Sequence, residues 1–304
     1  MKLPLLLAAL ACLSLRMEAA EPFWLDLYNG EPVPQEIVVE DLKTADVIYL
    51  GEVHTIERHH QMQADLLKEL AEGGQRPMAL GLEQLEARDQ PAVDRFNRGE
   101  LDFNQLADAI GWDKKWKNYE QYRSLCETAQ KNSIALKGLN APAEIIRQVS
   151  RGGGLAKLDT DLRSQLPPEI VTDDPQYEKL MNLMLSVHAS MDPEKLRPVF
   201  EAQVARDETM ASNIAAAAEG GKLVVVVCGR GHINYGLGTP ARVRRHLPNH
   251  KERILLATES GELKMTPEEK AMARKISITH EDLRALGRPL ADYTQIVPRK
   301  TNEP

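Results

Sequence analysis

The chain has 304 residues, of which 42% are hydrophobic and 27% charged, and its formal net charge is −7. This composition is that of a globular protein with enough residues to bury a sizeable core. It lacks the basic footprint of a nucleic-acid-binding protein, so nucleic acid is not an expected partner, and we interpret the short cluster Arg242–Arg245 as a solvated helix face.

The N-terminus has the pattern of a secretory signal. Lys2 precedes an apolar run from Leu3 to Leu15, and small residues follow at Ala19 and Ala20. This pattern predicts a signal peptide over residues 1–20, and the apolar run is too short to span a bilayer. A second interpretation is a lipoprotein cleavage site that places a lipid on Cys12. Both predict an exported protein that is periplasmic or associated with the outer membrane.

Two cysteines, Cys126 and Cys228, remain after the predicted signal peptide. In an oxidising compartment they could pair, but a helical setting for Cys126 and a strand setting for Cys228 equally fit two separate buried thiols. No Cys-x-x-Cys pair is present, which argues against structural zinc.

The rest of the chain alternates short apolar runs with helical patterns. This alternation predicts βα units and an α/β fold with a mostly parallel central sheet flanked by helices. Strands are predicted at 46–51, 78–82, 134–139, 223–228 and 253–258. Helices are predicted at 57–72, 88–98, 119–132, 143–151, 175–190, 194–218 and 240–247.

Three regions follow from this pattern. Residues 21–265 form the predicted α/β domain, and a helical excursion at about 155–220 is expected to cover the carboxyl edge of its sheet. Residues 266–304 are charged and weakly patterned, and we interpret them as a peripheral C-terminal extension.

Each of the first four predicted strands ends in glycine followed by polar side chains. Because the carboxyl ends of parallel strands lie along one edge, where ligands bind, these side chains are expected to converge. The residues are Glu52, His54, Glu83, Asn140, Arg230 and His232. Individually, Glu83 could cap a helix, Asn140 could belong to a turn and His232 to the core.

His59 and His60 begin the predicted helix after the first strand. We expect one of them to face inward and the other to face solvent. The chain has no His-Glu-x-x-His motif, so the zincin arrangement is not predicted.

Two further groups could contact a flat ligand. Tyr177, Met181, Met184, His188 and Met191 recur at helical spacing, which fits either an adaptable cofactor-binding face or a core-facing helix. Trp112, Trp116, Tyr119 and Tyr122 form an aromatic concentration, which fits either the mouth of a pocket or an anchored loop.

Several segments in order resemble one known family. They are "LGEVHTIERHH", "LGLEQL", "WKNYEQYRSL", "LKGLNAPAEIIRQVS", "FEAQVARDETMASNI" and "VVVVCGRGHINYGLGTPARV". Together, from about Val47 to Val243, they resemble the ChaN-like haem-binding lipoproteins, which take part in haem and iron uptake. This family is related to Tiki-type metalloproteases and erythromycin-esterase-like hydrolases.

The resemblance implies haem as the cofactor, held at the interface of a homodimer with tyrosine as iron ligand. It also implies an outer-membrane haem receptor system as a partner. The candidate haem-binding residues are Tyr177, His188, Tyr119, His59 and Arg230, with Tyr122 a further candidate tyrosine. Gln203 and Asp207 belong to the shared pattern and are expected on a helix facing the cleft.

The hydrolase relatives imply an alternative. Glu52, His54, Glu83 and His232 match positions that there serve a metal or an activated water, so they are the candidate catalytic residues and the candidate ligands of a divalent metal. No Gly-x-Ser-x-Gly elbow is present, which argues against a serine hydrolase.

Overall fold

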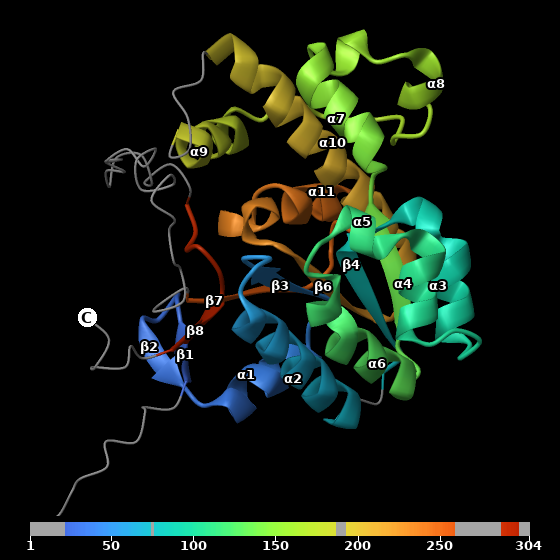
Figure 1. Ribbon diagram of the computed structural model, residues 1–304. Helices are drawn as coiled ribbons and strands as arrows, with labels where there is room; N and C mark the ends of the chain where they lie inside the picture. Colours follow the sequence, from blue (N-terminus) through green and yellow to red (C-terminus); the bar gives the residue numbers. More distant parts are fainter. Residues whose placement is uncertain (1–21, 74–75, 187–192, 259–286, 298–304) are drawn as a thin grey trace, which may run out of the picture.

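The computed structural model describes residues 22–73, 76–186, 193–258 and 287–297. Its centre is an eight-stranded sheet in the order β2-β1-β8-β7-β3-β6-β4-β5 (Figure 1). The strands are β1 (Phe23–Asp26), β2 (Glu31–Val33), β3 (Val47–Glu52), β4 (Met78–Glu86), β5 (Ala135–Asn140), β6 (Leu223–Gly229), β7 (Glu252–Ala257) and β8 (Tyr293–Ile296).

The sheet is parallel from β8 to β5, and β1 adds to it in antiparallel sense. Every residue of β3, β4 and β6 is buried. This fits parallel strands covered on both faces, which are near-continuous apolar runs. The α/β prediction and its five predicted strands are confirmed, with β4 four residues longer than expected.

Helices cover both faces of the sheet. They are α1 (Gln35–Lys43), α2 (Glu57–Gly73), α3 (Gln90–Asn97), α4 (Phe103–Ile110), α5 (Trp112–Lys115), α6 (Arg123–Lys131), α7 (Ala143–Gly152), α8 (Thr160–Arg163), α9 (Pro175–Ser186), α10 (Pro193–Ala217) and α11 (Thr239–His246). In the described part of the chain, no helix is both long and apolar enough to cross a membrane.

Strand β6 shows how the two cores are built. Val225 and Val227 join a cluster with residues of α1, α2 and α6, whereas Val224 and Val226 join a second cluster with residues of α10 and α11. Because successive side chains of a strand point to opposite faces, one all-valine run supplies both cores.

The helices α7 to α10 stand beyond the carboxyl edge of the sheet (Figure 1). Ile145 of α7 packs against Ala205 of α10, and Tyr177 of α9 packs edge-on against Phe200 of α10 at 5.7 Å between ring centroids. The lower part of α10 contacts β4, β5 and β6, so this one helix fixes the group to the sheet. A helical excursion at this edge was predicted, and it is confirmed.

Two sequence-based interpretations are wrong. Strand β8 lies inside the sheet between β7 and β1, so the segment beyond residue 266 is not wholly peripheral. Arg242 is also buried rather than solvated, with ion pairs to Asp174 and Glu208. Both errors share a cause, because a short strand or a buried arginine is specified by partners far away in sequence.

Cys126 and Cys228 are free and buried. The structure therefore has two separate buried thiols and no disulfide between Cys126 and Cys228.

Candidate functional site

Glu52, the last residue of β3, is the buried centre of one half of the site. Its Oε1 accepts hydrogen bonds from Tyr122 Oη at 2.5 Å, His54 Nδ1 at 2.8 Å and Gln84 Nε2 at 2.8 Å. Its Oε2 accepts from Gln63 Nε2 at 2.9 Å. Burial alone would raise the pKa of this carboxyl, but the hydrogen bonds and charges of the neighbouring histidines lower it to about 2. Glu52 is therefore a buried anion.

His54 follows β3 and lies above Glu52. Its Nδ1 is held by Glu52, its Nε2 is 4.0 Å from Glu83 Oε2, and its ring meets Trp116 edge-on at 4.9 Å between centroids. Burial lowers the pKa of His54, but the hydrogen bond to Glu52 and the charge of Glu83 outweigh this and raise it. The side chain is 33% exposed.

Glu83 on β4 joins the two halves of the site. Its Oε1 accepts from Arg206 Nη2 at 2.9 Å and lies 3.4 Å from His232 Nε2. Its Oε2 accepts from the backbone N–H of Gly229 at 2.7 Å. Desolvation opposes the charged form, but His232 and Arg206 dominate and hold the pKa of Glu83 well below its usual value. Glu83 is a bridging anion whose two oxygens already have partners.

The other half centres on Asp207 of α10. Its Oδ1 accepts from His232 Nδ1 and from Thr239 Oγ1, both at 2.7 Å, and its Oδ2 accepts from Tyr177 Oη at 2.8 Å. Gln203, one turn before Asp207, lies 3.0 Å from His232 Nδ1 through its amide nitrogen. Asp207 thus connects α9, α10, α11 and the end of β6.

Stability should fall at both pH extremes because of these groups. Burial lowers the pKa of His232, but Glu83 and Asp207 raise it to about 9 from an ordinary 6.5. Its contribution is therefore complete below pH 6.5 and is lost as the pH rises through 9. Glu52 contributes above pH 4.5 and loses its contribution as the pH falls toward 2.

Urea unfolding across a pH series measures this. We expect the alkaline loss to be about 3 kcal/mol in the wild type, and to shrink in a His232→Gln variant. An equally steep alkaline loss in that variant would assign the effect to other groups.

Hydrogen bonds confirm the predicted convergence for five of the strand-end residues, and the sixth lies at the same edge of the sheet. Glu52, His54, Glu83 and His232 form the network described above, and Asn140 joins it by donating from Nδ2 to the backbone carbonyl of Glu83 at 2.9 Å. The sixth, Arg230, begins the turn η4 (Arg230–His232) after β6 and is half-buried. Gln203 and Asp207 lie on α10 at the site, as predicted.

The candidate haem-binding residues have different settings. Tyr177 is 1% exposed, and burial together with the charge of Asp207 holds its pKa well above the usual value. Tyr119 is half-exposed, with its ring stacked parallel to Phe103 at 6.1 Å between centroids. His188 and Met191 lie outside the described residues. These roles remain predictions.

Both histidines of the α2 helix are buried, so the prediction of one solvent-facing histidine is wrong. His59 Nδ1 accepts from the backbone N–H of Val53 at 3.1 Å, and His60 Nε2 lies 3.4 Å from Glu52 Oε2. The tight turn after β3 places the first turn of α2 over the strand end, which covers both rings. Their immediate role is to hold this turn and the Glu52 carboxylate.

Three polar residues of the network were missed from sequence, Gln63, Gln84 and Arg206. Tyr122 was named as a candidate tyrosine for haem, but its hydrogen bond to Glu52 was not predicted. Gln84 directly follows Glu83, and Arg206 directly precedes Asp207. Both could have been found because each is adjacent in sequence to a predicted site residue. Gln63 had no such signal, because it lies on the helix α2, which packs over the sheet.

The aromatic group Trp112, Trp116, Tyr119 and Tyr122 was predicted either to anchor a loop or to form the mouth of a pocket, and its members divide between these two roles. Trp112 and Tyr122 are buried in the core, as an anchored loop requires. Trp116 contacts His54 and is half-buried, so this tryptophan borders the site.

The network does not have the geometry of a metal centre. Among the described residues, no group of three or more His, Cys, Asp or Glu side chains could hold a metal ion. The reason is that each carboxylate in the site already accepts hydrogen bonds from histidine, arginine, amide or hydroxyl donors. The prediction of a divalent metal at Glu52, His54, Glu83 and His232 is not supported.

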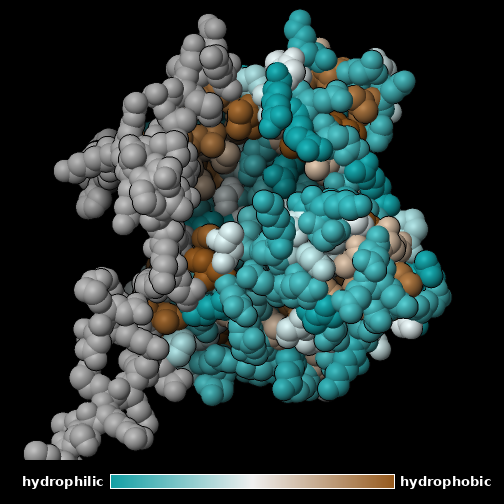
Figure 2. Space-filling view, in the orientation of Figure 1, coloured by the Kyte–Doolittle hydropathy of each residue, from teal (hydrophilic) through white to brown (hydrophobic). Residues whose placement is uncertain are grey.

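Above this network the surface is hollowed between α7–α10 and the body of the sheet, and we call this hollow the cleft (Figure 2). Its surface is mostly hydrophilic, with hydrophobic residues gathered at α9. Met184 of α9 lies close to Gly231 in the turn η4, 3.5 Å from where a Cβ would stand. The network side chains with the greatest exposure are His54 at 33% and Arg206 at 27%.

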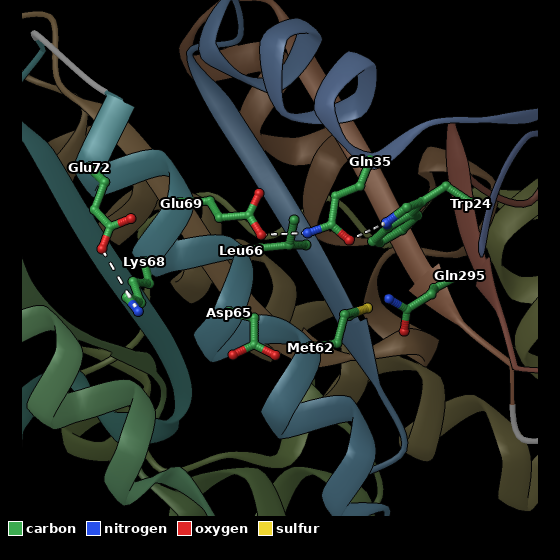
Figure 3. Close-up of a pocket in the computed structure, with 9 residues that line it drawn as sticks. All are labelled: Trp24, Gln35, Met62, Asp65, Leu66, Lys68, Glu69, Glu72 and Gln295. Atoms are coloured by element: carbon green, nitrogen blue, oxygen red, sulfur yellow. Dashed lines mark hydrogen bonds and ion pairs between the residues drawn. The ribbon is translucent and has the colours of Figure 1, made fainter. Parts of the chain in front are cut away.

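A separate pocket of about 220 Å³ lies between α1, α2 and the neighbouring strands β1 and β8 (Figure 3). Five of its polar side chains pair with one another: Gln35 donates to Glu69 and accepts from Trp24, and Lys68 pairs with Glu72 at 3.8 Å. It shares no lining residue with the network below the cleft.

A parallel sheet with polar side chains gathered at its carboxyl edge is typical of α/β proteins that bind a ligand at that edge. The model of the family described as "Haem-binding uptake, Tiki superfamily, ChaN" matches residues 38–243, and the chain belongs to this family. The resemblance seen in the sequence is thereby confirmed.

One solved structure supports the fold. ChaN of Campylobacter jejuni, in a structure titled for cofacial haem binding, is 20% identical, with a TM-score of 0.68, covering 91% of this chain and 97% of that one. An erythromycin esterase EreC mutant in its open conformation is 10% identical, with a TM-score of 0.44 over 77% of this chain and 76% of that one. No curated protein matches the chain.

Proposed function

We propose that this protein is exported and binds haem in the cleft, as part of haem acquisition. The observation that carries the proposal is the family match over residues 38–243, which includes all the strands and helices that build the network. Membership of a haem-binding uptake family supports haem as the ligand. The position of the cleft at the carboxyl edge of the sheet supports the site.

The residue types around the cleft fit haem, which is flat, largely apolar and carries two carboxylates. Met184 and Trp116 offer apolar and aromatic contacts. Arg206 is partly exposed and cationic, and Arg230 stands at the end of β6, so both are placed to meet propionates. When bound, haem would supply an iron centre with open axial positions.

We infer that Tyr119 is a better iron ligand than Tyr177 in the conformation described here. Tyr177 Oη is committed to Asp207, and freeing it would break a buried hydrogen bond. Tyr119 follows Asn118, whose amide donates to the backbone carbonyl of His54, so its backbone borders the site. Its ring stacks on Phe103 and a hydrogen bond to Glu120 raises the pKa of its hydroxyl, but Glu120 is exposed, so this bond is easier to give up than the buried one of Tyr177. Tyrosinate is a hard oxygen donor that suits ferric iron.

A haemin titration followed by absorption tests this assignment. We expect a saturable Soret band with the high-spin ferric character of a tyrosinate complex. Tyr119→Phe should change that spectrum, and Tyr177→Phe should preserve it. If Tyr177→Phe alone abolished the band while the variant stayed folded, the roles of the two residues would be reversed.

A homodimer, export and a receptor partner complete the proposal. Two-fold dimers are the commonest oligomers, and a second subunit would add covering surface to a ligand that one cleft leaves open. The predicted signal peptide over residues 1–20, or a lipid on Cys12, would place the protein in the periplasm or at the outer membrane, where an outer-membrane haem receptor system could supply it. Size-exclusion chromatography with and without haemin tests the dimer.

A second candidate function is hydrolysis, and the geometry of His54 favours it. A partly exposed histidine whose Nδ1 is held by a buried carboxylate has the arrangement of a general acid–base group. Turnover of an activated ester that disappears in His54→Ala but persists without haemin would support this function. Equal rates in both proteins would exclude His54 from such chemistry.

A further inference from the structure

Helix α7 presents a cationic face on the side opposite its buried residues. Arg147 and Arg151 are four residues apart and both exposed, whereas Ile145 and Val149 are buried on the opposite side. Residues at this spacing are neighbours on a helix surface. Lys157, at the end of the turn η3 (Leu155–Lys157), is also exposed and lines the same cavity as both arginines.

These two arginines differ from the rest in having no hydrogen bond or ion pair from their side chains. Elsewhere in the described ranges, every arginine has a partner, most often a carboxylate such as Asp46 for Arg76 or Asp41 for Arg253. The excess of positive charge on α7 is therefore local, in a chain whose net charge is −7.

The nearest carboxylate is already occupied. Glu144 lines the same cavity, but Arg88 donates to both of its oxygens, one guanidinium nitrogen to each. This pairing joins α7 to the turn after β4 and leaves Arg147 without a direct partner. Because Arg88 occupies both oxygens of Glu144, the cationic face of α7 can bind another anion.

There is room for such an anion. The cavity lined by α7 and η3, which we call the α7 cavity, has a volume of about 540 Å³. Gly152 in its lining has nothing within 4 Å of the position that a Cβ would take. A phosphate group therefore has space to reach the side chains.

We propose that the α7 cavity binds a phosphate-bearing anion through Arg147, Arg151 and Lys157. Two guanidinium forks and one ammonium group provide three positive charges and planar donors that match phosphate oxygens. A phosphate with two negative charges satisfies this set better than a single carboxylate. The phosphate could belong to a soluble compound or to the headgroup of an anionic lipid.

Two titrations of the full chain test this inference. Calorimetry with inorganic pyrophosphate measures binding of a soluble phosphate, and co-sedimentation compares phosphatidylglycerol vesicles with phosphatidylcholine vesicles. Saturable pyrophosphate binding identifies a soluble-phosphate site. Binding to phosphatidylglycerol vesicles without measurable pyrophosphate binding identifies a headgroup site. Binding to neither probe overturns the proposal.

The matched variants are Arg147→Gln/Arg151→Gln and the control Arg95→Gln/Arg98→Gln, whose exposed arginines pair with Glu100. The α7 variant should bind the effective probe at least about tenfold more weakly, because each arginine provides a charge-assisted hydrogen bond. The control should bind like the wild type, and equal losses in both variants would overturn the site. If the α7 variant lost its fold, Lys157→Gln would provide the same comparison.

Discussion

Replacing Glu52 by alanine should lower the free energy of unfolding by about 3–5 kcal/mol, the cost of removing one member of a buried charged network. Glu52 is 1% exposed and accepts hydrogen bonds from Tyr122, Gln63, Gln84 and His54. Without the carboxylate, these donors would stay buried with no acceptor, and a cavity would open beneath His54. A loss of this size is a large fraction of the stability of an ordinary domain.

Urea unfolding followed by circular dichroism measures this loss. Glu52→Gln keeps the volume but presents N–H groups to the surrounding donors, so we expect roughly half the effect. Glu100→Ala is the control, because Glu100 lies on the surface with two arginines and should leave stability unchanged. A Glu52→Ala protein as stable as the control would mean that the network is not formed.

The second large effect is expected from Asp207→Ala, at about 3 kcal/mol. This change leaves His232 as a buried imidazolium without its closest carboxylate and releases Tyr177 and Thr239 at the same time. Because Tyr177 fixes α9 through Asp207, hydrogen exchange in α9 should become faster. The variant would thus disturb stability and the wall of the cleft together.

Tyr177→Phe separates these contributions. It removes one of the three hydrogen bonds to Asp207 and should cost only about 1 kcal/mol. Faster exchange in α9 should appear in both variants, but the larger loss of stability only in Asp207→Ala. If both variants unfolded at the same urea concentration, His232 and Thr239 would contribute nothing through Asp207.

The sequence was sufficient to predict the sheet because its central strands are continuous apolar runs with clear ends. The run 223–228 contains four consecutive valines, and its short length and apolar, β-branched composition indicate a buried strand. Convergence of the strand-end residues then followed from parallel topology alone. Glu52, Glu83 and His232 were found in this way, although they come from three strands.

The roles of these residues could not be predicted as well as their positions. Glu52 was predicted as a cleft-facing acid or metal ligand, but hydrogen bonds from Tyr122 and Gln63, neither of which was predicted as its partner, make it a buried acceptor. The spacing of residues along one strand shows where a carboxylate lies. It does not show which side chains from distant helices saturate it.

Strand β8 and helix α1 were missed for a related reason. The β8 strand has four residues, all half-buried, and forms by pairing with β1 and β7 rather than through its own pattern. In α1, Val38, Val39 and Leu42 are buried, yet the helix has only nine residues, follows Pro34 as N-cap and carries a mixed polar face. Short elements of this kind depend on neighbours that a single segment does not reveal.

The central claim is that haem binds in the cleft, and a Soret titration with two matched variants tests it most directly. Met184→Glu puts a negative charge on a half-exposed residue beside Gly231, where haem would bring its apolar face and propionates. Ile37→Glu makes the same change at a residue that is 57% exposed on α1. We expect saturable haemin binding by the wild type and Ile37→Glu, and binding at least about tenfold weaker by Met184→Glu. No saturable Soret change in the wild type, or equal affinities in all three proteins, would contradict the account.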